Sequence, residues 1–188
     1  MEWFGDYLIK KSLENLKSKD SIAIIISSLR GGGAERVAIN IANNFSERFK
    51  KVYLIILVNK IKYQLKVNKK VKIINLDSKK TRFSVFPLLN NLNKYQPRYI
   101  LSIMRDSNLV LGVCSYFLNF KSKLIFREAN TFDQFEKENF FLKNIVRIIC
   151  IIFYNRSRNF IANSIDTKNS LNHFQTHHWI KEFDYWVF

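Results

Sequence analysis

Three consecutive glycines stand where a β-branched run gives way to an amphipathic segment. Gly31, Gly32 and Gly33 follow the apolar run Ile22–Ser28 and precede apolar residues that recur at helical spacing as far as Phe49. Glycine lets the backbone turn tightly and lets a ligand approach without a Cβ in the way. Free N–H groups at a helix start favour an anion, most naturally a phosphate. The sequence therefore predicts a strand, a phosphate-binding glycine loop and a helix, although such turns are also common without a ligand.

The glycine loop matches neither of two common phosphate motifs. A dinucleotide-binding turn needs another glycine at a later spacing, and a P-loop needs a Lys-Ser or Lys-Thr pair after its glycines. Here Ala34, Glu35 and Arg36 follow instead.

Polar residues also follow two later apolar runs, Tyr99–Met104 and Lys123–Phe126. Ligands of open α/β sheets bind at the carboxyl ends of the strands. Exposed ion pairs in loops are the alternative explanation for such residues. Four of these polar residues are candidates for ligand contacts: Asp106, Arg127, Glu128 and Asn130.

The elements that must position these residues alternate along the chain. Apolar runs predict strands at Ile22–Ser28, Val52–Val58, Val71–Leu76, Tyr99–Met104, Lys123–Phe126 and Asn159–Asn163. Helical patterns lie between or after them, at Ala34–Phe49, Phe86–Tyr95, Asn108–Leu118, Phe140–Arg156 and Asp166–Phe174. This alternation predicts an α/β fold with a doubly wound, mostly parallel, Rossmann-like sheet.

The alternation delimits one domain over residues 21–174. Residues 1–20 are interpreted as an N-terminal leader or a surface helix. The tail at 175–188 holds two of the 3 histidines and two of the 3 tryptophans, and it is not expected to continue the strand–helix rhythm. A change of reading frame that replaced a longer C-terminal half explains this tail better than a natural end that packs on the domain.

The formal net charge of +16 favours partners that carry phosphate: nucleic acid, anionic lipid or a phosphorylated small molecule. A solvated basic surface explains the charge equally well. Nucleic acid is not expected, because the sequence has no RNP-like aromatic pattern, recognition-helix signature or zinc finger. Cys114 and Cys150 have no motif spacing, so neither a disulfide nor a zinc site is predicted, and the compartment is expected to be reducing and cytoplasmic.

The segment Phe140–Tyr154 is apolar almost all round and must be covered by something. Its longest clean run, Ile148–Tyr154, is far shorter than the roughly 20 residues that a spanning helix needs. Burial between the sheet and a neighbouring helix is one explanation. Peripheral contact with anionic lipid, helped by the nearby Arg156 and Arg158, is the other.

Three segments carry a resemblance to a known family. The run SLRGGGAERVAINIAN resembles the first loop and helix of GT-B glycosyltransferases of family 4, whose pattern is Gly-Gly-Ala-Glu-Arg followed by an apolar helix. The order and spacing of the three segments fit over residues 22–174. The segments are Ser28–Asn43, Phe126–Asn130, and Phe160–Ser164 with the following Thr167 and Lys168.

The resemblance implies a fold and roles for the candidate residues. The chain would be one half of a GT-B fold, the N-terminal half that binds the acceptor. Its glycine loop, Gly31, Gly32 and Gly33, would reach across the cleft toward the donor diphosphate. Glu35 would orient that loop or meet a sugar hydroxyl, although a carboxylate in the first turn of a helix also simply complements the dipole. Acceptor contacts are implied for the remaining candidates: Asp106, Arg127, Glu128 and Asn130.

The implied activity is a retaining transfer of a sugar from a nucleotide-diphosphate donor to a glycan or lipid-linked acceptor, in polysaccharide or glycan biosynthesis at the inner face of the plasma membrane. The nucleotide-sugar is a substrate, so no cofactor is expected, and no metal either, because there is no Asp-x-Asp motif. No C-terminal donor domain fits after Ser164, so the chain is expected to be inactive by itself unless a separate chain supplies that domain. The alternative is a non-enzymatic basic α/β module that docks on a membrane or an anionic ligand.

Overall fold

The structure is a computed structural model that describes residues 20–59, 66–128, 148, 152–157, 159–169 and, for the backbone alone, 184–187. Several expectations lie outside these residues: the leader or surface helix before Asp20, the candidate Asn130, most of Phe140–Arg156, and the second half of Asp166–Phe174. Residues 152–154 and 165–169 are helical.

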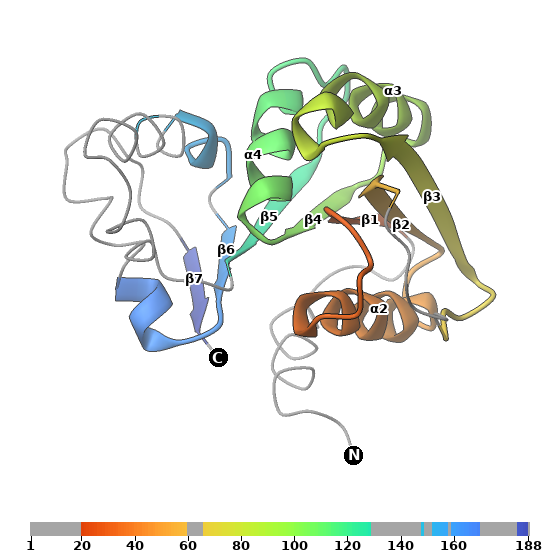
Figure 1. Cartoon of the computed structure of the whole chain (residues 1–188), viewed down its shortest axis with the longest axis horizontal. Helices are drawn as coiled ribbons and strands as arrows, with labels where there is room; N and C mark the ends of the chain where they lie inside the picture. Colours follow the sequence, from red (N-terminus) through yellow and green to blue (C-terminus); the bar gives the residue numbers. More distant parts are fainter. Residues whose placement is uncertain are drawn as a thin grey trace.

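A seven-stranded sheet in the order β3-β2-β1-β4-β5-β6-β7 forms the centre of the molecule, and each of its strand pairs is parallel (Figure 1). The order reverses between β1 and β4, which are neighbours although two strands separate them in the chain. The expected doubly wound α/β fold is confirmed. The strands are β1 (Ser21–Ile26), β2 (Lys51–Val58), β3 (Val71–Ser78), β4 (Tyr99–Ile103), β5 (Lys123–Glu128), β6 (Asn159–Ala162) and β7 (Asp184–Val187).

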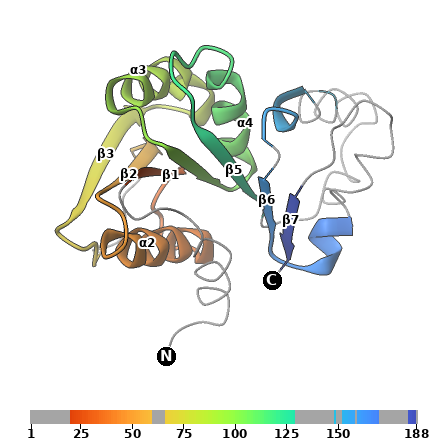
Figure 2. The same ribbon diagram turned by 180° about the vertical axis from the view of Figure 1, so that it is seen from behind.

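The sheet is apolar on both faces, and helices cover it from two sides (Figures 1 and 2). Alternate residues of a strand point to opposite faces, so Ile24 joins one core cluster and Ile25 the other. Helix α2 (Gly33–Ser46) packs in the first cluster. Helices α3 (Val85–Tyr95) and α4 (Arg105–Cys114) pack in the second. A short 3-10 helix, η1 (Thr81–Ser84), precedes α3.

Several boundaries differ from the sequence prediction. Strand β3 continues past Leu76 to Ser78, and as one of the two edge strands it exposes much of its length. Helix α4 begins at Arg105 rather than at Asn108. Strand β5 continues past Phe126 to Glu128.

The expectation that the strand–helix rhythm stops at residue 175 is also wrong. Strand β7 pairs in parallel with β6, in a register that joins Asn159 to Asp184 and Ala162 to Val187. The tryptophan-containing tail therefore adds an edge strand to the same sheet. Apolar and aromatic residues such as those of DYWV favour a strand, and this local signal outweighs the change in composition.

No helix within the described residues is both long enough and apolar enough to span a bilayer.

Cys114 makes the stability of the fold sensitive to alkaline pH. Its thiol is fully buried beneath α3, and Sγ lies 3.3 Å from the main-chain oxygen of Val85. Burial raises the pKa of the Cys114 thiol to about 12. Above pH 9 the unfolded thiol ionises while the folded thiol keeps its proton, so the folded state loses stability as the pH rises toward 12.

We expect the stability advantage of the native chain over Cys114→Ala to shrink by about 1.4 kcal/mol per pH unit above pH 9. Urea denaturation of both proteins at several pH values measures it. Other titrating groups are common to both proteins and cancel in the difference. An advantage that stays constant from neutral pH to pH 11 would contradict the buried neutral thiol.

Candidate functional site

The glycine loop joins β1 to α2 at the carboxyl edge of the sheet. Leu29 is fully buried and anchors the loop, whereas Arg30 is exposed. Gly31 has φ 102°, a conformation that side-chain-bearing residues rarely adopt. Gly32 is the N-cap of α2, with φ −80° and ψ 179°, and no side chain caps the helix there. The loop therefore needs a glycine at 31 and leaves the start of α2 open to an anion.

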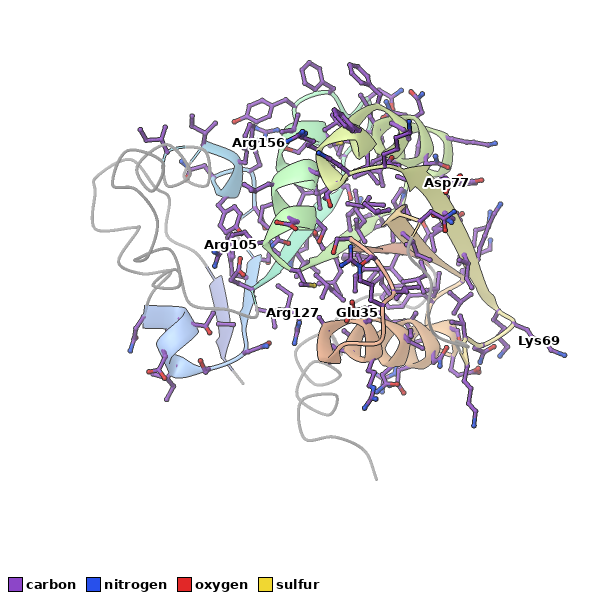
Figure 3. The ribbon with its side chains drawn as sticks, in the orientation of Figure 1. Glu35, Lys69, Asp77, Arg105, Arg127 and Arg156 are labelled. Atoms are coloured by element: carbon purple, nitrogen blue, oxygen red, sulfur yellow. The ribbon has the colours of Figure 1, made fainter. Side chains whose placement is uncertain are left out.

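Gly32 and Gly33 serve the loop in other ways. A Cβ on Gly32 would lie 2.5 Å from Glu35 Oε2, so the missing side chain makes room for the carboxylate of Glu35. Around Gly33 a Cβ would meet nothing within 4 Å. Glu35 is half-buried and folds back over the loop from the first turn of α2. Figure 3 shows Glu35 at the beginning of this helix.

The turn between β4 and α4 is the second feature of this edge. Met104 has φ 79° and ψ 150°, a strained conformation for a residue with a side chain, and it is the N-cap of α4. No side chain caps α4. Ser107 Oγ instead donates to the main-chain oxygen of Ile103 and, at 2.9 Å, to that of Met104. Asp106 is exposed in the first turn of α4.

Glu128 is at the centre of a buried polar network. Tyr154 Oη donates a hydrogen bond of 2.7 Å to Glu128 Oε2, and Arg105 Nη2 lies 3.6 Å from Glu128 Oε1. Asn108 Nδ2 donates to the main-chain oxygen of Arg127 at 3.1 Å and approaches Tyr154 Oη at 3.4 Å. The Glu128 side chain is only 1% exposed and that of Arg105 13%. The network ties the end of β5 to the start of α4 and to the helical segment 152–154.

The side chain of Arg127 lies on the opposite face of the sheet from the Glu128 network. Phe126 packs in the core cluster under α4, so Arg127 faces the side that α2 covers. It is 6% exposed and pairs in register with Ile103 and Ile161. The alternative of an exposed loop pair is wrong for Arg127 and Glu128, because β5 carries both residues into the interior.

The carboxyl ends of β1, β4 and β5 bring the candidate residues to one edge, since these strands are neighbours in the sheet. The glycine loop, Glu35 and Asp106 are accessible there, whereas Arg127 and Glu128 are buried beneath it. Asn130 lies outside the described residues.

Sequence reasoning missed four residues of this edge: Met104, Arg105, Asn108 and Tyr154. The position of Asn108, a polar residue on the face of a helix that is otherwise apolar, was the one available signal for a buried polar network. Nothing in the sequence marks Met104 as a residue with positive φ.

Two helix starts without side-chain caps therefore flank the point at which the strand order reverses. Each start presents main-chain N–H groups and the positive end of a helix dipole. Crevices at such switch points are where open α/β sheets bind ligands. The arrangement is suited to an anionic ligand such as a diphosphate. Within the described residues, no group of three or more His, Cys, Asp or Glu side chains is placed to hold a metal ion.

Neither a family model nor a curated protein matches the sequence. Solved structures are similar in fold. The Anabaena protein HepE, in complex with UDP and glucose, matches with a TM-score of 0.64 and 14% identity over 89% of this chain and 43% of HepE. The lipopolysaccharide outer core galactosyltransferase WaaB matches with a TM-score of 0.60 and 16% identity, over 82% of this chain and 42% of WaaB. Sucrose-phosphate synthase from Thermosynechococcus elongatus matches with a TM-score of 0.64 and 9% identity, over 90% of this chain and 47% of the synthase.

These neighbours are GT-B glycosyltransferases, and this chain has the Rossmann-like fold of one half of such a protein. The chain spans less than half the length of each of these three neighbours, 42% to 47%.

Proposed function

We propose that this chain is the acceptor-side half of a family 4 glycosyltransferase. It would act in the retaining transfer of a sugar from a nucleotide-diphosphate donor to a glycan or lipid-linked acceptor, in polysaccharide or glycan biosynthesis. The donor side of the cleft would be formed by a second domain. One observation carries the proposal: the uncapped starts of α2 and α4 face the switch between β1 and β4.

The fold supports the same proposal, because structural neighbours include HepE bound to UDP-glucose. In the proposed complex, Gly31 and Gly32 let the backbone N–H groups of α2 approach the donor diphosphate. Glu35 orients that loop, and Asp106 stands in the open first turn of α4, where an acceptor hydroxyl would reach it. Arg127 and Glu128 act beneath this surface by fixing the end of β5.

The chain alone is expected to bind UDP-glucose weakly. A few N–H groups on one wall of an open cleft cannot offset the several kcal/mol that association costs. The dissociation constant is expected to be about 1 mM or weaker. Backbone amide shifts of the labelled chain, titrated with UDP-glucose to a concentration on the order of 10 mM, measure both the affinity and the place of binding.

The proposal expects shifts at the amides of residues 31–35 and 104–107. The rival function, a non-enzymatic basic module docking on a membrane or an anionic ligand, is supported by the net charge of +16 and expects shifts only at clusters of Lys and Arg away from this edge. Titration with glucose is the control, since it lacks the diphosphate. Unperturbed loop amides, or micromolar binding elsewhere, would overturn the proposed role.

A further inference from the structure

A polar pocket lies at the edge of the sheet opposite the glycine loop. A pocket of about 510 Å³ opens where β4, β5 and β6 begin, and four of its lining residues are cations: Arg98, Lys121, Lys123 and Arg156. Strand β5 runs from Lys123 to Glu128, so this amino edge is roughly 17 Å from the glycine-loop edge at about 3.3 Å per residue. In Figure 3, Arg105 and Arg156 lie near opposite ends of α4. The pocket is therefore separate from the candidate site above.

Among the described residues, no carboxylate lines this pocket. All four cations are exposed, and none forms an ion pair with another described residue. Asp20, which precedes β1, is not among the lining residues. Several like charges at one hollow repel one another and create a local positive potential, which a bound anion would relieve.

Arg156 is held in place by its own contacts. Its Nε donates to Ser115 Oγ at 3.2 Å, and Nη2 donates to the main-chain oxygen of Ser115 at 3.3 Å. The guanidinium also stacks over the ring of Tyr116, 4.5 Å from the centroid. These contacts use only part of its five donors, so a positioned fork of N–H groups remains for an oxyanion.

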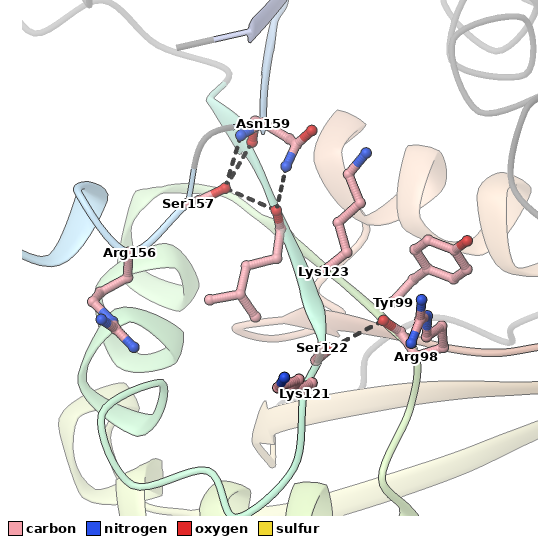
Figure 4. Close-up of a pocket in the computed structure, with 9 residues that line it drawn as sticks. Arg98, Tyr99, Lys121, Ser122, Lys123, Arg156, Ser157 and Asn159 are labelled. Atoms are coloured by element: carbon pink, nitrogen blue, oxygen red, sulfur yellow. Dashed lines mark hydrogen bonds between the residues drawn. The ribbon is translucent and has the colours of Figure 1, made fainter. Parts of the chain in front are cut away.

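The floor of the pocket is also fixed. Ser157 Oγ donates to the main-chain oxygen of Leu124 at 2.8 Å and accepts from the Asn159 N–H at 3.1 Å. Figure 4 shows these bonds, and it shows Arg156 and Arg98 on opposite sides of the start of β5, with Lys121 between them in the view. The cations thus surround a floor whose own hydrogen bonds are made within the protein.

We propose that this amino-edge pocket binds a ligand through its phosphate groups. Arginine forks match phosphate oxygens, and cations from separate elements suit an anion that carries several negative oxygens. The volume falls in the range of small-molecule sites, so the phosphate belongs either to a phosphorylated small molecule or to the headgroup of a lipid.

The test compares two double variants of the full chain. Lys121→Gln/Lys123→Gln removes two charges from the pocket. Lys66→Gln/Lys69→Gln removes two exposed charges elsewhere, and Figure 3 shows Lys69 at the far end of the molecule from Arg156. Inorganic pyrophosphate is the soluble probe, titrated by calorimetry at low salt. Vesicles of phosphatidylcholine with or without phosphatidic acid are the lipid probe, assayed by sedimentation.

We expect the pocket variant to weaken the binding of at least one probe by about 10-fold or more, and the control variant by less than about 2-fold. Loss of pyrophosphate binding identifies a soluble ligand, and loss confined to phosphatidic acid vesicles identifies a headgroup. Equal losses in both variants would mean that general charge alone binds the anion, and binding of neither probe by the native chain would mean that there is no site. Either result overturns the proposal. Thermal melting of both variants checks that they fold.

Discussion

Glu128→Ala is expected to lower the free energy of unfolding by about 3 kcal/mol, the cost of removing one partner from a buried ion pair. The carboxylate is 1% exposed and serves both Arg105 and Tyr154. Its loss leaves a largely buried guanidinium beside a cavity and deprives Tyr154 Oη of its acceptor. Urea denaturation of the full chain, followed by far-UV circular dichroism, gives the free energy.

Two matched variants separate the parts of this effect. Tyr154→Phe removes one hydrogen bond and keeps the ring that packs 5.5 Å from those of Phe126 and Phe160, so it should cost about 1 kcal/mol. Glu128→Gln keeps an acceptor for Tyr154 but removes the charge, and its cost should fall between those of the other two. If Glu128→Ala costs no more than Tyr154→Phe, Arg105 draws no stability from the carboxylate and the network reduces to one hydrogen bond.

This network also shows why the sheet was easier to predict than the site. The run Ile22–Ile26 is buried on both faces, and an uninterrupted apolar run that is rich in β-branched residues is typical of a strand inside a parallel sheet. The alternation of such runs with amphipathic segments then fixes the doubly wound class. These are local patterns, so the sequence displays them directly.

The boundaries that went wrong depend on contacts made at long range. Arg105 is polar, and apolar periodicity alone therefore places it outside α4. Arg127 and Glu128 are charged, so the apolar pattern alone ends β5 at Phe126. Arg105 and Glu128 are held inside by partners distant in sequence: they pair with each other, and Tyr154 bonds Glu128 across 26 positions. Burial of a charge depends on such a partner, and spacing along the chain does not reveal it.

The glycine loop was predicted from its residues, but its conformation was not. Three adjacent glycines are equivalent in the sequence, whereas in the structure only Gly31 has a positive φ. Gly32 has an ordinary extended conformation and matters for the room that it leaves to Glu35. The role of each glycine depends on the angle at which the chain enters α2. The packing of α2 against β1 and β2 sets that angle.

Gly31→Val is expected to lower the free energy of unfolding by about 1 to 3 kcal/mol, because a β-branched residue at φ 102° is strained whatever space surrounds it. It is also expected to abolish the shifts that UDP-glucose induces at the loop amides, since the strain is relieved by turning those N–H groups away. Urea denaturation and the amide titration measure the two effects on the same protein.

Gly33→Ala is the matched control, because a Cβ there meets nothing within 4 Å and the residue opens α2. Its stability should be unchanged or higher by about 0.5 kcal/mol, with the titration intact. Gly32→Ala should separate fold from function: the new Cβ displaces the flexible end of Glu35, so stability stays within about 0.5 kcal/mol of native while the UDP-glucose shifts weaken. Equal urea midpoints for Gly31→Val and Gly33→Ala would place the positive φ elsewhere. If Gly32→Ala leaves the titration unchanged, Glu35 has no part in orienting the loop, and its carboxylate only complements the dipole of α2.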